Sequence, residues 1–111
     1  MADKYAIFDA AVDLVAEGAL DAAIAKYHEA LAMDAEFADA WQGLALAYND
    51  LGRYPEAIDA AKKLCDITPD DVLAHTTLSR IYQAAGMIAE AEAEGGKARI
   101  LDWKRQLKDG E

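Results

Sequence analysis

Residues 41–58 read WQGLALAYNDLGRYPEAI, and Gly52 inside this stretch marks a period that runs through the chain. Glycine recurs 34 residues earlier and 34 residues later. Neighbouring residues keep the same interval, which is typical of an internal repeat. Small and large residues both recur in register: Gly18, Gly52 and Gly86; Ala11, Ala45 and Ser79; Ala23, Ala57 and Ala91; Leu14, Tyr48 and Tyr82; Leu20, Tyr54 and Ile88. The sequence therefore predicts three related units, each one period long.

Each unit predicts a helix, a turn marked by glycine and a second helix. In the second unit Trp41, Leu44 and Tyr48 share one helical face. Gly52 suits the left-handed conformation that often closes a helix, and Pro69 follows the second helix because proline cannot continue it. Abundant alanine and few β-branched runs favour an all-α fold. The expected helices cover 3–17, 20–33, 38–51, 54–67, 71–85 and about 88–108.

The second unit, residues 38–71, resembles the tetratricopeptide repeat. That pattern is W-x2-L-G-x2-Y, then G-x-Y-x2-A, then a bulky residue, an alanine and a proline. Ala45 stands for the first glycine of the pattern, and the other positions match: Trp41, Leu44, Tyr48, Gly52, Tyr54, Ala57 and Pro69.

The first and third units match the same pattern with substitutions. In residues 4–37, Ile7 replaces the tryptophan and Ala35 replaces the proline, and the matches are Leu14, Gly18, Leu20, Ala23, Tyr27 and Ala30. In residues 72–105, Gly95 replaces the bulky residue and Trp103 replaces the proline, and the matches are Leu78, Ser79, Tyr82, Gly86, Ile88, Ala91 and Ala98. The resemblance implies one domain over 1–111, a right-handed α-solenoid of three helix-turn-helix repeats with an extended C-terminal helix.

The resemblance also implies a concave groove lined by the first helix of each repeat, in which such proteins bind partners. Projected onto this chain, the groove residues are Tyr5, Phe8, Val12 and Val15; Asp39, Gln42, Leu46 and Asn49; and Leu73, Thr76, Arg80 and Gln83. Its apolar side chains concentrate in the first repeat. These form a binding floor, are covered by self-association, or tuck under an adjacent helix.

One specialised activity of the family is not expected here. Members that grip the C-terminal carboxylate of chaperone tails use Lys and Asn on the first groove helix, Asn on the second, and Lys and Arg on the third. The corresponding positions in this sequence hold none of these residues: Phe8, Val12, Gly43, Leu73 and Thr77.

The end of the chain carries a separate apolar pattern. Ala89, Ala93, Gly96, Ile100, Trp103 and Leu107 are spaced to lie along one side of a helix. Gly95 and Gly96 weaken this helix by roughly 2 kcal/mol relative to alanines, so a break there stays open. Ile100, Trp103 and Leu107 are expected either to cap the last repeat, in the region 95–108, or to form a seam for a partner or a second copy. The cap is favoured, because Trp103 is the nearest large side chain to Gly95.

The sequence offers little for catalysis. His28 and His75 fall on different helices, no metal-ligand spacing occurs, and neither glycine-rich phosphate motif is present. His75 takes the place of the repeat tryptophan, and Cys65 falls where the first repeat has Leu31, so both are expected to pack. The sequence predicts no catalytic residues, no metal and no cofactor.

Composition narrows the expected partners and location. The net charge of −10 argues against nucleic-acid binding, and no apolar run is long enough to cross a membrane. The charge is uneven: residues 1–96 hold 18 acidic and 6 basic side chains, whereas 97–111 hold 3 acidic and 5 basic. The start lacks the features of a secretory signal, and the single cysteine agrees with a reducing, cytoplasmic setting.

The sequence therefore predicts a non-catalytic, acidic scaffold or adaptor that holds a peptide segment of a protein partner in its groove. The charge favours partners that are apolar or basic. The alternative is a self-associating structural subunit that uses the apolar faces of its terminal helices. The expected state is a monomer or a weak homodimer.

Overall fold

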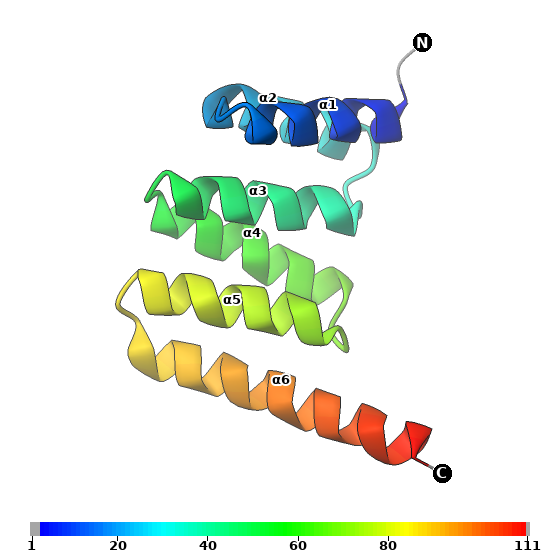
Figure 1. The fold of residues 1–111 in the computed structure, drawn as a ribbon, viewed down its shortest axis with the longest axis vertical. Helices are drawn as coiled ribbons and strands as arrows, with labels where there is room; N and C mark the ends of the chain where they lie inside the picture. The colour runs from blue at the N-terminus through cyan, green and yellow to red at the C-terminus, as the bar shows by residue number, and fades with distance from the viewer. Residues whose placement is uncertain (1–2, 111) are drawn as a thin grey trace.

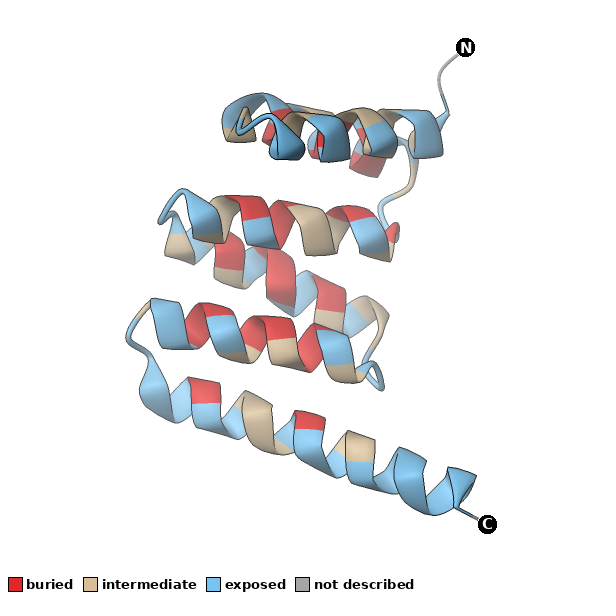
Figure 2. Ribbon diagram, viewed as in Figure 1, coloured by how far each residue is buried: buried red, intermediate tan, exposed pale blue. Residues whose placement is uncertain are grey.

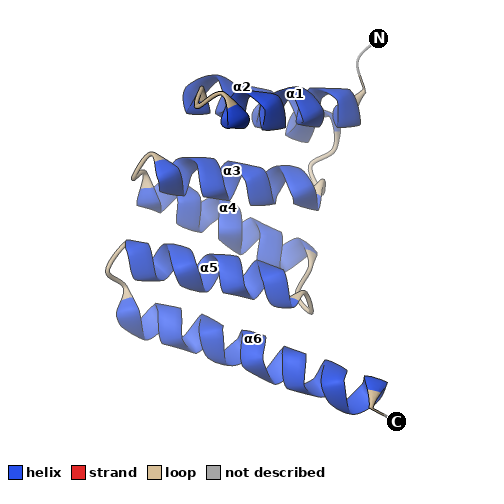
Figure 3. Cartoon of the chain, in the orientation of Figure 1, coloured by secondary structure: helices blue, strands red, loops and turns tan. Residues whose placement is uncertain are grey.

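The computed structural model describes residues 3–110, and within that range it contains six helices and no strand. Residues 1–2 and 111 of the expected domain lie outside the described residues. The prediction of an all-α solenoid is confirmed (Figures 1 and 3). The helices are α1 (Lys4–Ala16), α2 (Leu20–Met33), α3 (Ala38–Asp50), α4 (Tyr54–Ile67), α5 (Val72–Ala84) and α6 (Ile88–Asp109).

The three glycines of the repeat close the first helix of each hairpin. Gly18, Gly52 and Gly86 have φ angles of 80°, 75° and 80°, a conformation that costs glycine little. The residue after each glycine donates its N–H to a carbonyl five residues earlier, as in a Schellman motif. The three equivalent hydrogen bonds are Ala19 to Leu14 (2.9 Å), Arg53 to Tyr48 (2.9 Å) and Met87 to Tyr82 (2.8 Å).

The hairpins α1–α2, α3–α4 and α5–α6 stack along the long axis of the molecule (Figure 1). α2 and α4 also contact the first helix of the next hairpin, and α3 contacts both α1 and α5. In Figure 1, α4 lies behind α3 and α5, and no two second helices contact each other within the described residues. This arrangement gives the first helices a shared exposed face.

Small side chains form the contacts within each hairpin. Ala11, Ala23, Ala45 and Ala57 are completely buried, and larger apolar residues pack around them. Figure 2 shows the buried residues concentrated in the inner helices, whereas the end of α6 is exposed. The small residues that recur at the repeat period therefore lie where two helices approach closely.

Polar side chains replace part of this packing in the third repeat. His75 occupies the place of Trp41, is 8% exposed, and its Nε2 lies 2.7 Å from the Pro69 carbonyl. Trp41 donates the equivalent hydrogen bond, from Nε1 to the Ala35 carbonyl at 2.8 Å. Histidine thus keeps the contact of the tryptophan one period earlier, and its expected packing role is confirmed.

The last helix runs without a break through Gly95 and Gly96, because α6 packs on α5 on both sides of the pair. Its packing face contains Ala91 and Ala98. A Cβ on Gly95 would lie 3.4 Å from the Ser79 hydroxyl oxygen, so α5 already fills the space beside this glycine.

The sequence favours a capping role for Ile100, Trp103 and Leu107, but these side chains are 53%, 59% and 55% exposed. Only Ile100 lies beside the third repeat in a shared hollow, with Pro69 and His75. No large residue is needed over Gly95, since the two helices meet there through small side chains. The other predicted role of these three residues, a seam for a partner or a second copy, stays a prediction.

Two glycines with opposite surroundings test this packing. A Cβ on Gly43 would clash with the Tyr27 ring, whose Cε1 lies 2.6 Å away and which is only 3% exposed. A Cβ on Gly96 meets only an Arg99 side-chain nitrogen, at 3.9 Å. We expect Gly43→Ala to lower the melting temperature, because overpacking costs about 1–3 kcal/mol. Gly96→Ala should raise it, because alanine favours a helix by about 1 kcal/mol. Thermal melts followed by circular dichroism measure both, and a stabilised Gly43→Ala variant would contradict the close contact.

Candidate functional site

The twelve predicted groove residues lie on the first helices and divide into two groups. Eight side chains are exposed: Tyr5, Val12, Val15, Asp39, Leu46, Leu73, Arg80 and Gln83. Four are half-buried: Phe8, Gln42, Asn49 and Thr76. The shared face is thus accessible, but it is narrower than the sequence predicted.

Four of the five exposed apolar residues of the predicted groove lie on the first two repeats. We call Tyr5, Val12 and Val15 of α1 with Leu46 of α3 the N-terminal patch. Tyr5 is 60% exposed, and its ring meets Phe37 edge-on with centroids 5.5 Å apart. The Tyr5 ring is thereby held in place by the core while most of its surface faces solvent.

Phe8 is a packing residue and does not form part of a free binding floor. Its ring lies 5.3 Å from the Phe37 ring and 5.9 Å from the Tyr27 ring, measured between centroids. Both neighbours are buried. Of the three interpretations of the apolar residues on α1, burial under an adjacent helix applies to Phe8, whereas Val12 and Val15 stay exposed.

Two amides of α3, those of Gln42 and Asn49, are partly buried. Gln42 Nε2 donates to Thr77 Oγ1 at 3.0 Å and so links α3 to α5. Gln42 Oε1 and Asn49 Oδ1 are buried without a hydrogen-bond partner among the described residues. An unpaired buried acceptor is costly, and a donor from a bound segment would relieve that cost.

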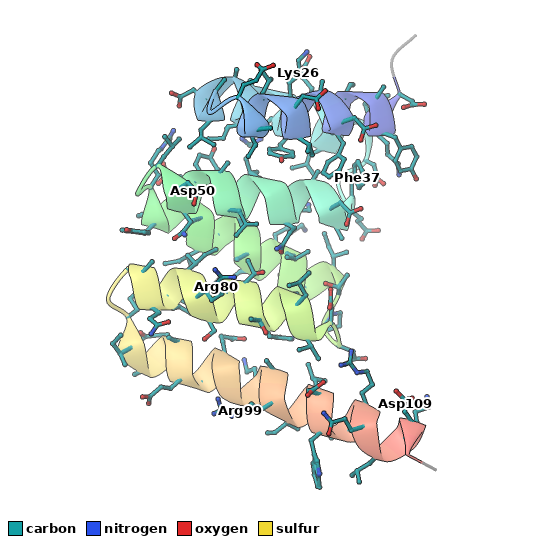
Figure 4. All side chains as sticks on the ribbon, viewed as in Figure 1. Lys26, Phe37, Asp50, Arg80, Arg99 and Asp109 are labelled. Atoms are coloured by element: carbon teal, nitrogen blue, oxygen red, sulfur yellow. The ribbon has the colours of Figure 1, made fainter. Side chains whose placement is uncertain are left out.

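The groove changes character at the third repeat. Arg80 of α5 and Arg99 of α6, both labelled in Figure 4, line the same hollow of about 400 Å³. Arg80 was predicted to lie in the groove, whereas Arg99 was not, since α6 is a second helix. The other lining residues are Val72, Thr76, Ser79, Gly95, Ala98 and Asp102.

A second hollow of about 390 Å³ lies where α2, α3 and α4 meet. Its apolar walls are repeat residues, among them Trp41, Leu44 and Tyr48. The Tyr48 hydroxyl lies 3.2 Å from His28 Nε2, and Arg53 stacks 4.9 Å from the centroid of the Tyr48 ring. This hollow lies outside the predicted groove, and its walls are explained by repeat packing.

Comparison with known families identifies the architecture. The family model described as tetratricopeptide repeat matches residues 8–72, more than half of the chain. The chain belongs to the tetratricopeptide repeat family. Among curated proteins, none matches the sequence.

Solved structures of tetratricopeptide repeat proteins share the fold. A crystal structure of MamA is 26% identical with a TM-score of 0.89, covering 95% of this chain and 61% of MamA. The second tetratricopeptide domain of Spaghetti (RPAP3), bound to the HSP90 peptide SRMEEVD, is 20% identical with a TM-score of 0.82 and covers 89% of this chain and 92% of that one. The translocator chaperone SycD of Yersinia enterocolitica is 16% identical with a TM-score of 0.83, covering 96% and 84%. The chain thus spans about three fifths of the length of MamA.

In this tetratricopeptide array the third repeat holds the main cluster of titratable groups. His75 Nδ1 lies 2.9 Å from Glu94 Oε2, and Lys97 Nζ donates to Glu94 Oε1 at 2.9 Å. Both partners of the His75 ring, the Glu94 carboxylate and the Pro69 carbonyl, are acceptors. The two ring nitrogens of His75 thus join α6 to the connection that precedes α5.

The same cluster changes the ionisation of its neighbours. Burial raises the pKa of Glu94, but the hydrogen bonds from His75 and Lys97 lower it by more, so the net pKa lies below the ordinary 4.5. Burial, with the Glu94 charge, raises the pKa of the Cys65 thiol to about 11. Cys65 is therefore a neutral thiol at pH 7 and a poor nucleophile.

The described part of the chain shows no group of three side chains arranged as metal ligands. Among the same helices, none is long and apolar enough to cross a membrane.

Glu94 should make the stability of the protein depend on pH. Its pKa is lowered on folding, so its contribution is present above the ordinary carboxylate pKa and is lost as the pH falls through the folded value. We expect Glu94→Gln to lower the urea midpoint at neutral pH, and the difference from wild type to vanish on acidification. The exposed Glu90→Gln is the control and should leave the midpoint unchanged at every pH. An equal loss at neutral and acidic pH would show that the Glu94 charge is not the cause.

Proposed function

We propose that this protein is a non-catalytic protein-binding module that holds a segment of its partner on the concave face of α1, α3 and α5. The observation that carries the proposal is the N-terminal patch, where four apolar side chains stay exposed on two adjacent first helices. Exposed apolar surface of this kind marks interaction sites. The fold supports it, since Spaghetti (RPAP3) uses the same architecture to bind a peptide.

The charge around the patch indicates the chemistry of the partner. Asp9 of α1 and Asp39 and Asp50 of α3 are all exposed. Lys4 is the one cation on these two helices as described, and it pairs with Asp34. The first two repeats therefore favour an apolar segment with basic side chains, in an extended or helical conformation.

The ligand differs in chemistry from the HSP90 peptide. SRMEEVD has more acidic than basic side chains. Here the positions expected for a carboxylate clamp hold Phe8, Val12, Gly43, Leu73 and Thr77, none of which is charged. Gly43 has no room for any side chain, because Tyr27 fills the space beside it.

A non-catalytic role follows from the same side chains. The polar groups of His75 and Glu94 hold the third repeat together, and the raised pKa of Cys65 suppresses its nucleophilicity. The acidic net charge disfavours nucleic acid as a partner. We also propose a reducing, cytoplasmic setting, in keeping with a single half-buried thiol.

A self-associating subunit is the second candidate. The observation in its favour is the exposure of Ile100, Trp103 and Leu107 on α6. This apolar stripe lies outside the repeat core and, like the N-terminal patch, is typical of an interaction surface.

Substitutions in the N-terminal patch test the groove. We expect Val12→Glu and Leu46→Glu each to reduce the affinity for a partner captured from native lysate by about tenfold or more, since a buried carboxylate would lose its hydration. Ala25→Glu, which adds the same charge to an exposed site on α2, is the matched control and should bind as wild type does. Calorimetry with the captured partner measures the affinity, and thermal melts check folding. Unchanged binding by both patch variants would place the site elsewhere.

The peptide SRMEEVD provides a test that needs no unknown partner. We expect no saturable binding to this chain at millimolar peptide, because the groove lacks cations at the clamp positions and is acidic in its first two repeats. Fluorescence anisotropy of the labelled peptide is the measurement. Saturable binding that is lost in Val12→Glu would contradict the proposed ligand chemistry while supporting the groove itself.

A further inference from the structure

The last turns of α6 carry an exposed apolar stripe, of which Ile100 also lines a hollow beside Pro69 and His75. Ile100, Trp103 and Leu107 are all more than half exposed. Helical spacing places each of them about half a turn from Ala98, which is buried against the repeat. Figure 1 shows this end of α6 reaching past the start of α5. Nothing in the described part of the chain covers the stripe.

This end of α6 is basic in a chain that is otherwise acidic. From residue 97 to 109 it holds five cations and two carboxylates. Lys104 and Lys108 follow Trp103 and Leu107 directly in the sequence, and both line a hollow beside Asp70 and Asp71. We call residues 97–109 the basic tail. The surface that best complements the basic tail is both apolar and acidic.

The N-terminal patch is such a surface, and it belongs to the same molecule. Apart from Asp13 at the end of the stack, three exposed aspartates, Asp9, Asp39 and Asp50, lie on the helices that present its four apolar side chains. The basic tail spans about 20 Å at 1.5 Å per residue, comparable to the width of two packed helices. The apolar stripe can therefore lie across α1 and α3 while its lysines approach the aspartates.

We propose, on the basis that the concave face binds partner segments, that one partner is the basic tail of a second copy of this chain. This contact joins two different surfaces, the basic tail of one copy and the N-terminal patch of another. A dimer therefore keeps one unoccupied tail and one unoccupied patch, and further copies add head to tail. A symmetric pairing of two tails would instead bring ten cations together. A basic amphipathic helix also suits an anionic lipid surface, and binding to vesicles is therefore one outcome of the experiment below.

Sedimentation velocity over a range of micromolar concentrations tests the association. The average mass of wild type should rise with concentration. The dissociation constant should increase about tenfold between roughly 0.05 M and 0.5 M salt, because opposite charges are screened. Trp103→Glu and Val12→Glu should each remain monomeric, and Ala25→Glu should associate as wild type does. All three positions are exposed, so thermal melts should match wild type.

Mixing the two monomeric variants decides which surfaces meet. Trp103→Glu keeps an intact patch and Val12→Glu keeps an intact tail, so the mixture should form a one-to-one dimer that stops growing.

A wild type that stays monomeric throughout, or a Val12→Glu variant that still dimerises, overturns the proposal. Binding to vesicles with anionic lipid, seen as a Trp103 fluorescence shift in a protein that stays monomeric, also overturns it. If an external partner is lost in Val12→Glu while wild type is monomeric, the groove function stands and only the self-association fails.

Discussion

The architecture depends on the close approach of two helices inside each repeat. Ala11 and Ala23 in the first hairpin, and Ala45 and Ala57 in the second, have no exposed surface. Because alanine has only a Cβ, the helix backbones come close enough for large side chains on either side to interlock. A larger residue at any of these positions would separate the helices along their length, so one small contact sets the geometry of the hairpin.

This contact also determines where the binding surface lies. Each hairpin packs through one side of its first helix, and the next hairpin stacks on a second side. The third side of α1, α3 and α5 has no neighbour, and stacking brings these free sides together. Residues at the border between the second and third sides, such as Phe8 and Gln42, are half-buried. The groove is thus formed by the sides of the first helices that contact neither their own second helix nor another hairpin.

Charges replace apolar residues at both ends of the stack. Ile24 is buried and Ile58 half-buried where another hairpin follows, but the corresponding Glu92 of the third repeat is exposed. At the other end, Asp13 is exposed where Ala47 of the second repeat is buried. A further hairpin docked on either face would bury these carboxylates at a cost of several kcal/mol. The end faces therefore favour solvent or polar contacts, unlike the interfaces between the repeats.

Most helix bounds were predicted within one residue, because the repeat period, the turn glycines and the apolar spacing agree with one another. The exposure of Trp103 was not predicted. The spacing of apolar residues shows which of them share a helix face, but not which neighbouring helix covers that face. The burial of Phe8 was missed for a related reason: Phe37, which packs against it, lies in the connection between repeats, where the period gives no contact.

The third repeat differs from the others in what holds it together. Apolar packing of Trp41 and Ala45 gives way to hydrogen bonds from His75 and from Ser79, whose hydroxyl donates to the Ala91 carbonyl at 2.7 Å. Only two residues of α6 are buried, although it is the longest of the described helices. Glu94 of α6 therefore matters to this contact, because it bonds to both His75 of α5 and Lys97 of α6. Its protonation would weaken these bonds, so the packing of α6 on α5 loses stability as the pH falls.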